Sequence, residues 1–336
     1  MWKYIDKSKT NEFLLSLDLI DNKLIDKDKI KKLYSISNNI EDNYKVFKIK
    51  KRNGKYRTIY EPTYNLKYLQ KQILNNILNN YKISKYAKAY HKGISLKDNA
   101  IPHTNKDIIL KLDLENFFDN ISFVDVYNSC FPIEYFPKPI GVLLTHLVTY
   151  EDHLTQGSPT SAYISNLVMK EFDETLGDYC DKINVSYTRY SDDMTFSGNF
   201  NPTDIIKKVN KLLKKTTLSL NKDKIHIIRK NNKQLVTGIV VNEKVSIDKH
   251  YRKKIRQELY YIKKYGLKSH LTHIACNKSK EIYLNSLYGK ILYILQIDNT
   301  NKEFINYKQY IKKLLNRWKY VKKRLLHHWK KYQQNN

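Results

Sequence analysis

Three aspartates, Asp113, Asp192 and Asp193, have the residue type and the setting of a metal site for phosphate chemistry. Asp113 ends the apolar run 107–112, and the Asp192–Asp193 pair lies between two alternating runs in VSYTRYSDDMTFSG. Adjacent carboxylates repel each other, and burying them is costly unless a cation neutralises them. Three carboxylates at strand ends suit Mg²⁺, which prefers oxygen ligands and keeps positions for water and phosphate. Two such ions about 3.5–4 Å apart stabilise the attacking and leaving oxygens of a displacement at phosphorus.

The acidic pair alone is a weak signal, because Asp is common in turns. A second segment, TQGSPTSAYISNLVM, lies between the two acidic segments. It is a glycine-containing loop that leads into a helix, so its backbone N–H groups can face an anion or a base pair. Acids and anion-facing loop together indicate a phosphate-transfer site.

Hydrophobic periodicity predicts the elements that must position these groups. Asn53-Gly54 between alternating runs is a strong hairpin signal. Helices are predicted over 11–20, 26–37, 66–78, 163–176 and 203–218, strands over 107–112 and 234–242, and hairpins over 44–62 and around Asp192. From 249 onward the pattern is helical and basic. The acids can therefore meet only through tertiary folding.

Composition favours a polyanionic partner. The 336 residues include 61 Lys or Arg and 33 Asp or Glu, for a net charge of +28. Such a surplus repels itself unless nucleic acid or an anionic membrane screens it. No apolar run approaches the roughly 18–20 residues that span a bilayer, and the N-terminus lacks a signal-peptide core. We expect a cytoplasmic protein without membrane association. The three cysteines are far apart, and we expect reduced core thiols. The 28 tyrosines fit either an AT-rich genome or base stacking.

The order of these segments closely resembles that of a reverse transcriptase over roughly residues 46–300. The order is basic hairpin, acid after a strand, Gln-Gly-Ser-Pro loop, Tyr-x-Asp-Asp hairpin and LSLNKDKIHI. The resemblance implies an α+β right-hand polymerase with fingers, a palm built on an antiparallel sheet and a helical thumb. The implied parts are a helical extension (1–45), fingers (46–110), a palm (111–245, with a fingers-side insertion around 123–160) and a thumb with a basic C-terminal helix (246–336).

The resemblance also implies roles for individual residues. Asp113, Asp192 and Asp193 match the metal-binding acids of the family, with the Leu114 carbonyl as a further ligand. Two Mg²⁺ ions are implied, with Mn²⁺ as a possible substitute. Phe118 matches the aromatic gate against a 2′-OH on the incoming sugar, whereas we expect its neighbour Phe117 to be core.

The nucleotide-binding residues are carried over in the same way. Gln156 and Gly157 match the loop against the incoming dNTP, and Tyr190 belongs to the same pocket. Lys224 matches the lysine thought to protonate the pyrophosphate leaving group, although a solvated face is the default for any Lys in this chain. Arg57, and less surely Lys51 or Lys55, match the cations that grip the triphosphate; a guanidinium can bind phosphate in a bidentate manner.

Two further elements resemble retron reverse transcriptases. They are Asn-Ala-x-x-His, with Asn99 and His103, and Val-Thr-Gly, with Thr237 and Gly238. The resemblance implies a cognate structured non-coding RNA, synthesis from an internal 2′-OH, a branched RNA-linked single-stranded DNA (msDNA), an effector protein and a role in anti-phage defence. His103 has an alternative role as a hydrogen-bonded structural histidine. The loop departs from the family in having Ala162 where a proline is more common, which affects geometry and not chemistry.

The basic C-terminal region fits a thumb that holds nucleic acid by its backbone. The cations assigned to it are Arg252, Lys253, Arg256, Lys263, Lys322, Lys323 and Arg324. A helix that simply packs on the thumb with a solvated face is an equal alternative for the tail.

Two other functions stay open on the sequence. One is a bacterial reverse transcriptase of another lineage, either a different defence enzyme or an intron-derived protein. The other is a catalytically idle RNA-binding scaffold, which the intact acidic set disfavours. The substitution Asp192→Asn separates these, because an idle scaffold would function without that carboxylate.

Overall fold

The computed structural model describes residues 6–20, 23–50 and 54–334; for residues 319 and 321–334 only the helical backbone is described. The chain forms two compact units, Met1–Asn232 and Lys233–Asn336. The second unit begins before the thumb boundary at 246 that we expected from the sequence. The assignment of fingers, palm and thumb stays a prediction.

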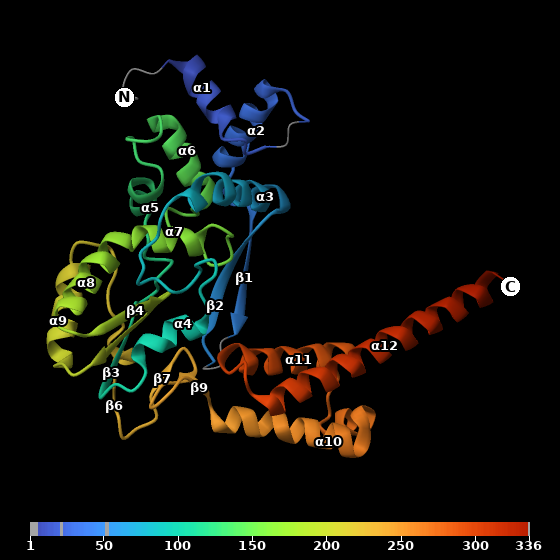
Figure 1. The fold of residues 1–336 in the computed structure, drawn as a ribbon. Helices are drawn as coiled ribbons and strands as arrows, with labels where there is room; N and C mark the ends of the chain where they lie inside the picture. The colour runs from blue at the N-terminus through green and yellow to red at the C-terminus, as the bar shows by residue number, and fades with distance from the viewer. Residues whose placement is uncertain (1–5, 21–22, 51–53, 335–336) are drawn as a thin grey trace. The chain divides into compact units, whose positions relative to one another are not determined.

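The first unit opens with two helices and a long hairpin (Figure 1). The helices are α1 (Lys7–Ser16) and α2 (Asp26–Asn38), and strands β1 (Tyr44–Lys50) and β2 (Tyr56–Pro62) pair antiparallel from Tyr44↔Pro62 to Lys50↔Tyr56. The hairpin predicted over 44–62 is confirmed, although residues 51–53 of its turn lie outside the described part of the chain.

The helix predicted over 66–78 changes its winding along its length. It begins as α3 (Tyr64–Gln72), continues as a π-helix over Ile73–Ile77 and ends as a 3₁₀ turn over Leu78–Asn80. Gln70 is fully buried in α3 and donates to the Tyr44 hydroxyl at 2.8 Å and the Leu147 carbonyl at 2.9 Å. Tertiary hydrogen bonds to a buried amide thus join this helix to the hairpin and to α6 (Lys138–Val148).

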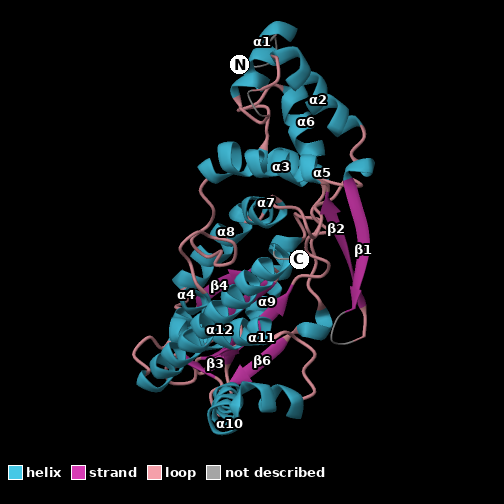
Figure 2. Ribbon diagram, turned by 90° about the vertical axis from the view of Figure 1, so that its right-hand side faces the viewer, coloured by secondary structure: helices cyan, strands magenta, loops and turns pink. Residues whose placement is uncertain are grey.

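A four-stranded antiparallel sheet carries the acidic residues (Figure 2). Its order is β4-β5-β3-β6, with β3 (Ile108–Asp113), β4 (Ser186–Tyr190), β5 (Asp193–Gly198) and β6 (His226–Arg229). The strand predicted over 107–112 and the hairpin around Asp192 are confirmed. The other helices of this unit are α4 (Leu96–Ala100), α5 (Phe123–Cys130), α7 (Ser161–Val168), α8 (Lys170–Lys182) and α9 (Pro202–Leu213).

The register of the sheet separates an apolar face from a polar face. Because side chains alternate along a strand, the pairings Leu110↔Phe196 and Tyr187↔Phe196 place buried apolar groups on one face. The pairings Lys111↔Thr195 and Asp113↔Asp193 place polar groups on the other. The sheet therefore packs its core on one side and presents the acids on the opposite side.

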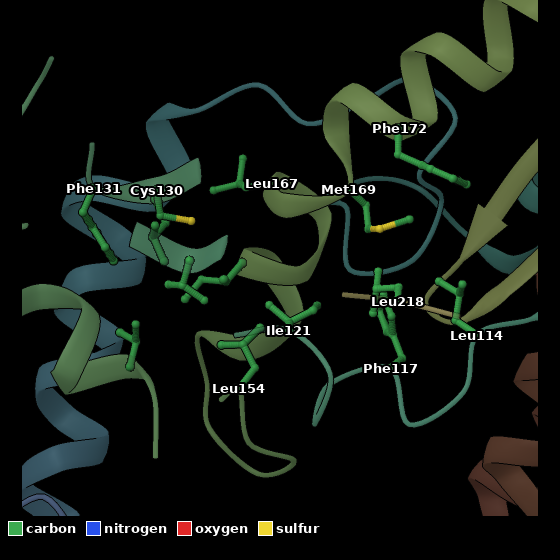
Figure 3. Close-up of a cluster of buried hydrophobic side chains, with 14 of the residues drawn as sticks. Leu114, Phe117, Ile121, Cys130, Phe131, Leu154, Leu167, Met169, Phe172 and Leu218 are labelled. Carbon is green, nitrogen blue, oxygen red and sulfur yellow. The ribbon is translucent and has the colours of Figure 1, made fainter. Parts of the chain in front are cut away.

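The core of this unit continues from the sheet into the surrounding helices. Figure 3 shows Leu114, Phe117, Ile121, Leu167 and Met169 in one apolar cluster, and each is at most 7% exposed. Phe117 is thus the core residue that we expected. All three cysteines are free thiols; Cys130 and Cys180 are buried, whereas Cys276 is only half-buried.

Two predicted elements are each divided into two in the structure. The helix predicted over 163–176 is two helices, because the chain breaks at Met169 (φ −82°, ψ 0°) between α7 and α8. The strand predicted over 234–242 is a tight hairpin of β7 (Leu235–Val236) and β8 (Ile239–Val240), with Thr237 and Gly238 at positive φ in its turn. Positive φ at both central residues is the geometry of the commonest hairpin turns.

The second unit is a small sheet followed by helices. The sheet has the order β7-β8-β9, with β9 at Ser246–Ile247. Three helices follow, α10 (Lys249–His273), α11 (Lys280–Ile297) and α12 (Lys302–Gln334), and α11 packs against both other helices (Figure 1). Ile255, Leu259 and Ile262 form the buried face of α10. No described helix combines the length and apolar character that crossing a lipid bilayer requires.

Candidate active site

The sheet register brings Asp113 and Asp193 together. Asp113 ends β3 and Asp193 begins β5, and the two are direct partners on the polar face. Asp192 lies in the turn that enters β5, and its carbonyl accepts from the Leu114 N–H at 3.1 Å. Ser191 in this turn has φ 62°. The backbone thus holds the three aspartates at one end of two paired strands, as the sequence predicted.

The acids are largely withdrawn from water. Asp113 is 6% exposed, and Asp192 and Asp193 are half-buried. Burial raises the pKa of Asp192, and the charge of Asp113 raises it further. Burial also raises the pKa of Asp193, with the charges of Asp192 and Asp113 adding to the shift and Lys111 opposing it. The site therefore favours an added positive charge.

Lys224 supplies part of that charge. Its Nζ lies 2.7 Å from Asp113 Oδ1, and its side chain is about half exposed. The hydrogen bond to Asp113 raises the pKa of Lys224, and the charges of all three aspartates act in the same direction. The sequence analysis predicted that Lys224 belongs to this site, and in the structure Lys224 forms an ion pair with Asp113.

The donor set fits a hard divalent cation that is completed by other ligands. Among the described residues, no group of three or more His, Cys, Asp or Glu side chains is arranged so that it could hold a metal ion by itself. Mg²⁺ sites that hold substrate phosphate use only one or two carboxylates and keep other positions for water and phosphate. The paired Asp113 and Asp193 fit such a partial set, and the metal-binding role of these residues, of Asp192 and of the Leu114 carbonyl stays a prediction.

A buried arginine that the sequence analysis missed supports the acidic turn. Arg189 is completely buried and binds Asp173 of α8 through Nε (2.9 Å to Oδ1) and Nη2 (2.6 Å to Oδ2). Its Nη1 donates to the Ser191 carbonyl at 2.9 Å, and its Nη2 also reaches Asn166 Oδ1 at 3.1 Å. The one available signal was a charged residue in the strand run SYTRY, three positions before Asp192.

The loop at Gln156 and Gly157 is joined to the β1–β2 hairpin. The Tyr60 N–H of β2 donates to the Gln156 carbonyl at 2.9 Å. Gly157 has φ 131°, and a Cβ there would lie 2.5 Å from the Tyr60 carbonyl oxygen. Ser158 Oγ donates to Gln70 Oε1 at 3.0 Å. Only glycine permits this close approach of loop and strand.

Two of the three predicted triphosphate cations lie at the same hairpin among the described residues. Arg57 and Lys55 are exposed at and beside β2. Among the described residues, the ion pair to the acids comes from Lys224 and not from Arg57. Lys51 lies outside the described residues. These contacts remain predictions.

Two aromatic residues flank the acids in sequence. Phe118 is half-buried against Phe117, with ring centroids 5.4 Å apart, and Phe117 in turn packs under Arg189. Tyr190 is half-buried and is the register partner of Asp193. The predicted place of Tyr190 in the nucleotide pocket stays a prediction.

Asn99 and His103 are internal, which corrects their assignment as nucleic-acid contacts. They are 1% and 0% exposed. His103 Nδ1 lies 2.7 Å from Ser197 Oγ and its Nε2 lies 2.8 Å from Thr188 Oγ1. Burial lowers the pKa of His103 to about 3. A neutral imidazole therefore links the segment before β3 to β4 and β5 by hydrogen bonds. His103 thus has the structural role that the sequence left open as an alternative.

The predicted thumb contacts differ in their surroundings. Arg256 makes two hydrogen bonds to Glu303, at 2.7 and 2.6 Å, so its guanidinium is directed to a protein carboxylate. Lys263 Nζ lies over the rings of Tyr307 and Tyr310. Lys253 and Gly238 are exposed, whereas Arg252 and Thr237 are half-buried. The side chains of Lys322, Lys323 and Arg324 lie outside the described residues.

Comparison with known proteins gives a family match. Residues 49–256 match the family model described as reverse transcriptase (RNA-dependent DNA polymerase). The retron Ec86 reverse transcriptase of Escherichia coli is 31% identical over 292 residues, which cover 82% of this chain and 85% of that protein. The retron Mx65 reverse transcriptase of Myxococcus xanthus is 28% identical over 240 residues, which cover 65% of this chain and 56% of that protein.

A solved structure of telomerase from Candida albicans is also similar, with a TM-score of 0.45 and 11% identity. The match covers 80% of this chain and 63% of the telomerase chain.

Proposed function

The chain belongs to the reverse transcriptase family, and from this premise we propose that it copies a cognate structured RNA into branched, RNA-linked single-stranded DNA. It is an RNA-directed DNA polymerase of retron type with an α+β right-hand fold. The observation that supports active polymerisation is the pairing of Asp113 with Asp193, with Asp192 beside them. An idle scaffold would gain nothing from this costly group of acids.

We propose that Asp113, Asp192, Asp193 and the Leu114 carbonyl hold divalent cations, with Mg²⁺ the expected ion and Mn²⁺ a substitute. Bound there, two such ions would neutralise charge on the attacking and leaving oxygens. The chain itself orients the carboxylates through the β3–β5 register and the Arg189 contact to Ser191. Lys224, which now binds Asp113, would turn to the leaving pyrophosphate once a cation takes over that carboxylate.

The nucleotide would lie between the acids and the fingers hairpin. Arg57, with Lys51 and Lys55, would bind the dNTP triphosphate by charge-assisted hydrogen bonds. Gln156 and Gly157 would lie against the base pair, and Phe118 with Tyr190 would line the sugar. A ring under the sugar leaves no room for a 2′-OH, which would select deoxynucleotides.

The remaining parts of the proposal concern the RNA. A retron enzyme would start from a 2′-OH of its own non-coding RNA, keep the DNA product attached and act with an effector protein in anti-phage defence. The basic C-terminal unit would hold the RNA backbone, where Lys253 is exposed and Lys263 is positioned by two tyrosine rings.

The test is to purify the protein from cells that carry its native locus and to sequence the nucleic acid that copurifies. Asp192→Asn replaces a carboxylate of the site by a neutral amide, which removes one negative charge with little change in shape. Asp178→Asn is the matched control, because Asp178 is an exposed carboxylate of α8. We expect a discrete DNA joined to a defined RNA with the wild type and Asp178→Asn, and RNA alone with Asp192→Asn.

Other results would favour the alternatives. Primer extension without any branched product would indicate a reverse transcriptase of another lineage. Heterogeneous RNA, with no DNA and no effect of Asp192→Asn on function, would indicate an idle scaffold.

A further inference from the structure

The second unit contains a cavity that the polymerase site does not use. Its volume is about 350 Å³, and it is lined by Tyr261, Tyr265, Ser269, His270 and His273. All five belong to α10, the orange helix of Figure 1. Ligand pockets begin at about 300 Å³, so this cavity, here called the α10 pocket, can hold a small planar group.

The walls of the α10 pocket are aromatic and nearly parallel. The Tyr261 ring lies 6.2 Å from the His270 ring at 13° and 6.1 Å from the Tyr265 ring at 24°. The helix breaks at Gly266, where φ is 83° and ψ is 156°. This left-handed conformation favours glycine. The break lets rings from both sides of Gly266 line one cavity.

A hydrogen-bond chain fixes the tautomer of His270. Lys290 Nζ lies 3.1 Å from Glu258 Oε1, so this carboxylate is an acceptor. The Tyr283 hydroxyl donates to Glu258 Oε2 at 2.9 Å and thereby uses its only hydrogen. His270 Nε2, 2.9 Å from the Tyr283 oxygen, must then be the donor of that bond. In a neutral imidazole this leaves Nδ1 as an acceptor.

This Nδ1 acceptor lacks a partner. His270 is 4% exposed, and within the described residues its Nδ1 is buried without a hydrogen bond. Burial lowers the pKa of His270, which keeps the ring neutral. Buried polar atoms are nearly always satisfied, so His270 Nδ1 is an acceptor that still lacks a donor group.

The surroundings of the pocket favour a nucleic acid as the source of that group. The helix α10 carries eight Lys or Arg and one Glu. Lys264 Nζ lies 5.2 Å from the Tyr265 ring at the pocket rim. Aromatic walls with adjacent cations are the combination that binds bases and backbone of single-stranded nucleic acid.

We propose that the α10 pocket binds one unpaired nucleobase of the cognate RNA, stacked on Tyr261 and Tyr265 and donating an N–H to His270 Nδ1. This inference rests on the proposed function, because it names the chemistry by which the RNA partner is held. It requires an unpaired base, since a paired base has its N–H groups occupied and its faces stacked.

The test is equilibrium binding of short fluorescent oligoribonucleotides of each base, and of an abasic oligomer of equal length, in EDTA and without dNTPs. Tyr265→Ala removes a pocket wall. Tyr260→Ala is the matched control, because both tyrosines are 54% exposed on α10 but Tyr260 does not line the pocket. We expect Tyr265→Ala to weaken binding of at least one base oligomer by about five- to hundred-fold, the range of base–aromatic stacking. The abasic oligomer and Tyr260→Ala should show no such loss.

A second measurement addresses the acceptor directly. In ¹⁵N spectra of histidine-labelled protein, His270 Nδ1 should resonate as an unprotonated nitrogen and shift on adding the base oligomer but not the abasic one. Equal losses on base and abasic oligomers, or no difference between Tyr265→Ala and Tyr260→Ala, would overturn the proposal. The proposal would also be overturned if a protein segment fills the α10 pocket and oligomer binding does not depend on the base. Because these measurements involve no catalysis, their failure is distinct from absent primer extension, which would refute the proposed function.

Discussion

At neutral pH the fold is opposed by the ionised carboxylates of Asp192 and Asp193. Burial raises the pKa of each, together with charges of neighbouring acids. A raised carboxyl pKa contributes stability below its unfolded value near 4, and this contribution is lost as pH rises through the folded pKa. The acidic turn is therefore a source of instability that a bound cation would relieve.

Asp192→Asn should therefore raise the thermal unfolding midpoint at neutral pH in EDTA, while it abolishes polymerisation. Below about pH 3 the gain should disappear, because the wild-type carboxyl is then protonated in both states. Mg²⁺ should stabilise the wild type more than the variant. Thermal unfolding followed by circular dichroism measures both effects, with Asp178→Asn as control. An equal or lower midpoint for Asp192→Asn in EDTA would contradict this account.

The Arg189–Asp173 pair provides a second prediction for single residues. Arg189→Met leaves Asp173 as a buried unpaired charge and should cost about 3–5 kcal/mol. Arg189→Met combined with Asp173→Leu should recover most of the stability, because apolar replacements of buried ion pairs are often tolerated. The double variant should still have a reduced kcat, because the Ser191 carbonyl has lost its donor. Urea unfolding and primer extension measure the two properties, and full recovery of both would show that Arg189 has no positioning role.

The positions of the three aspartates at strand ends were predictable because Asp113 follows an apolar run and the Asp192–Asp193 pair lies between two alternating runs. Arg189 and Asp173 were not, because their pairing depends on how α8 lies against β4, and no local pattern specifies that. For His103 the sequence left two roles open, and burial between Thr188 and Ser197 decided for the structural one.

At the scale of elements, local signals predicted what local geometry controls. The β1–β2 hairpin, β3 and the β4–β5 hairpin follow from turn residues and alternation. The break at Met169 and the π segment Ile73–Ile77 do not, because both occur in apolar helical patterns that tertiary packing interrupts. The Thr237-Gly238 turn was missed because Thr rarely adopts positive φ and the flanking apolar residues conceal it.

Gly157→Ala tests the junction between the loop at Gln156 and Gly157 and the β1–β2 hairpin. The added Cβ would lie 2.5 Å from the Tyr60 carbonyl at an unfavourable φ, so the loop must move away from β2. We expect the KM for dNTP to rise at least about tenfold, since about 1.4 kcal/mol of lost binding suffices. Steady-state primer extension measures this effect.

Gly289→Ala is the control for that experiment. Gly289 is exposed in α11, and a Cβ there meets nothing within 4 Å. It should leave KM unchanged and stabilise the protein by about 1 kcal/mol, the helix preference for Ala over Gly. A similar KM for both variants would show that the loop at Gln156 and Gly157 does not contribute to nucleotide binding.

For the whole molecule, the net charge of +28 predicts strongly salt-dependent RNA binding. Charge reversal of Lys322, Lys323 and Arg324 should weaken retention of the RNA and reduce the slope of log K against log salt by about 2, at about 0.7 per phosphate contact. Nucleotide addition on a generic primer should persist. Filter binding over a salt titration measures the slope, and an unchanged slope would assign these cations to a solvated face.

The two-faced register of β3 and β5 restricts how this chain can change in length during evolution. Deletion of one residue between Thr188 and Phe196 would exchange the faces of the following strand, moving acids toward the core and apolar groups toward water. Deletion of two residues would keep each following side chain on its face of the sheet, but it would shift Asp193 out of register with Asp113. Length variation among descendants should therefore concentrate in segments such as the Lys230–Lys233 connection, while the paired segments keep a constant spacing between the acids.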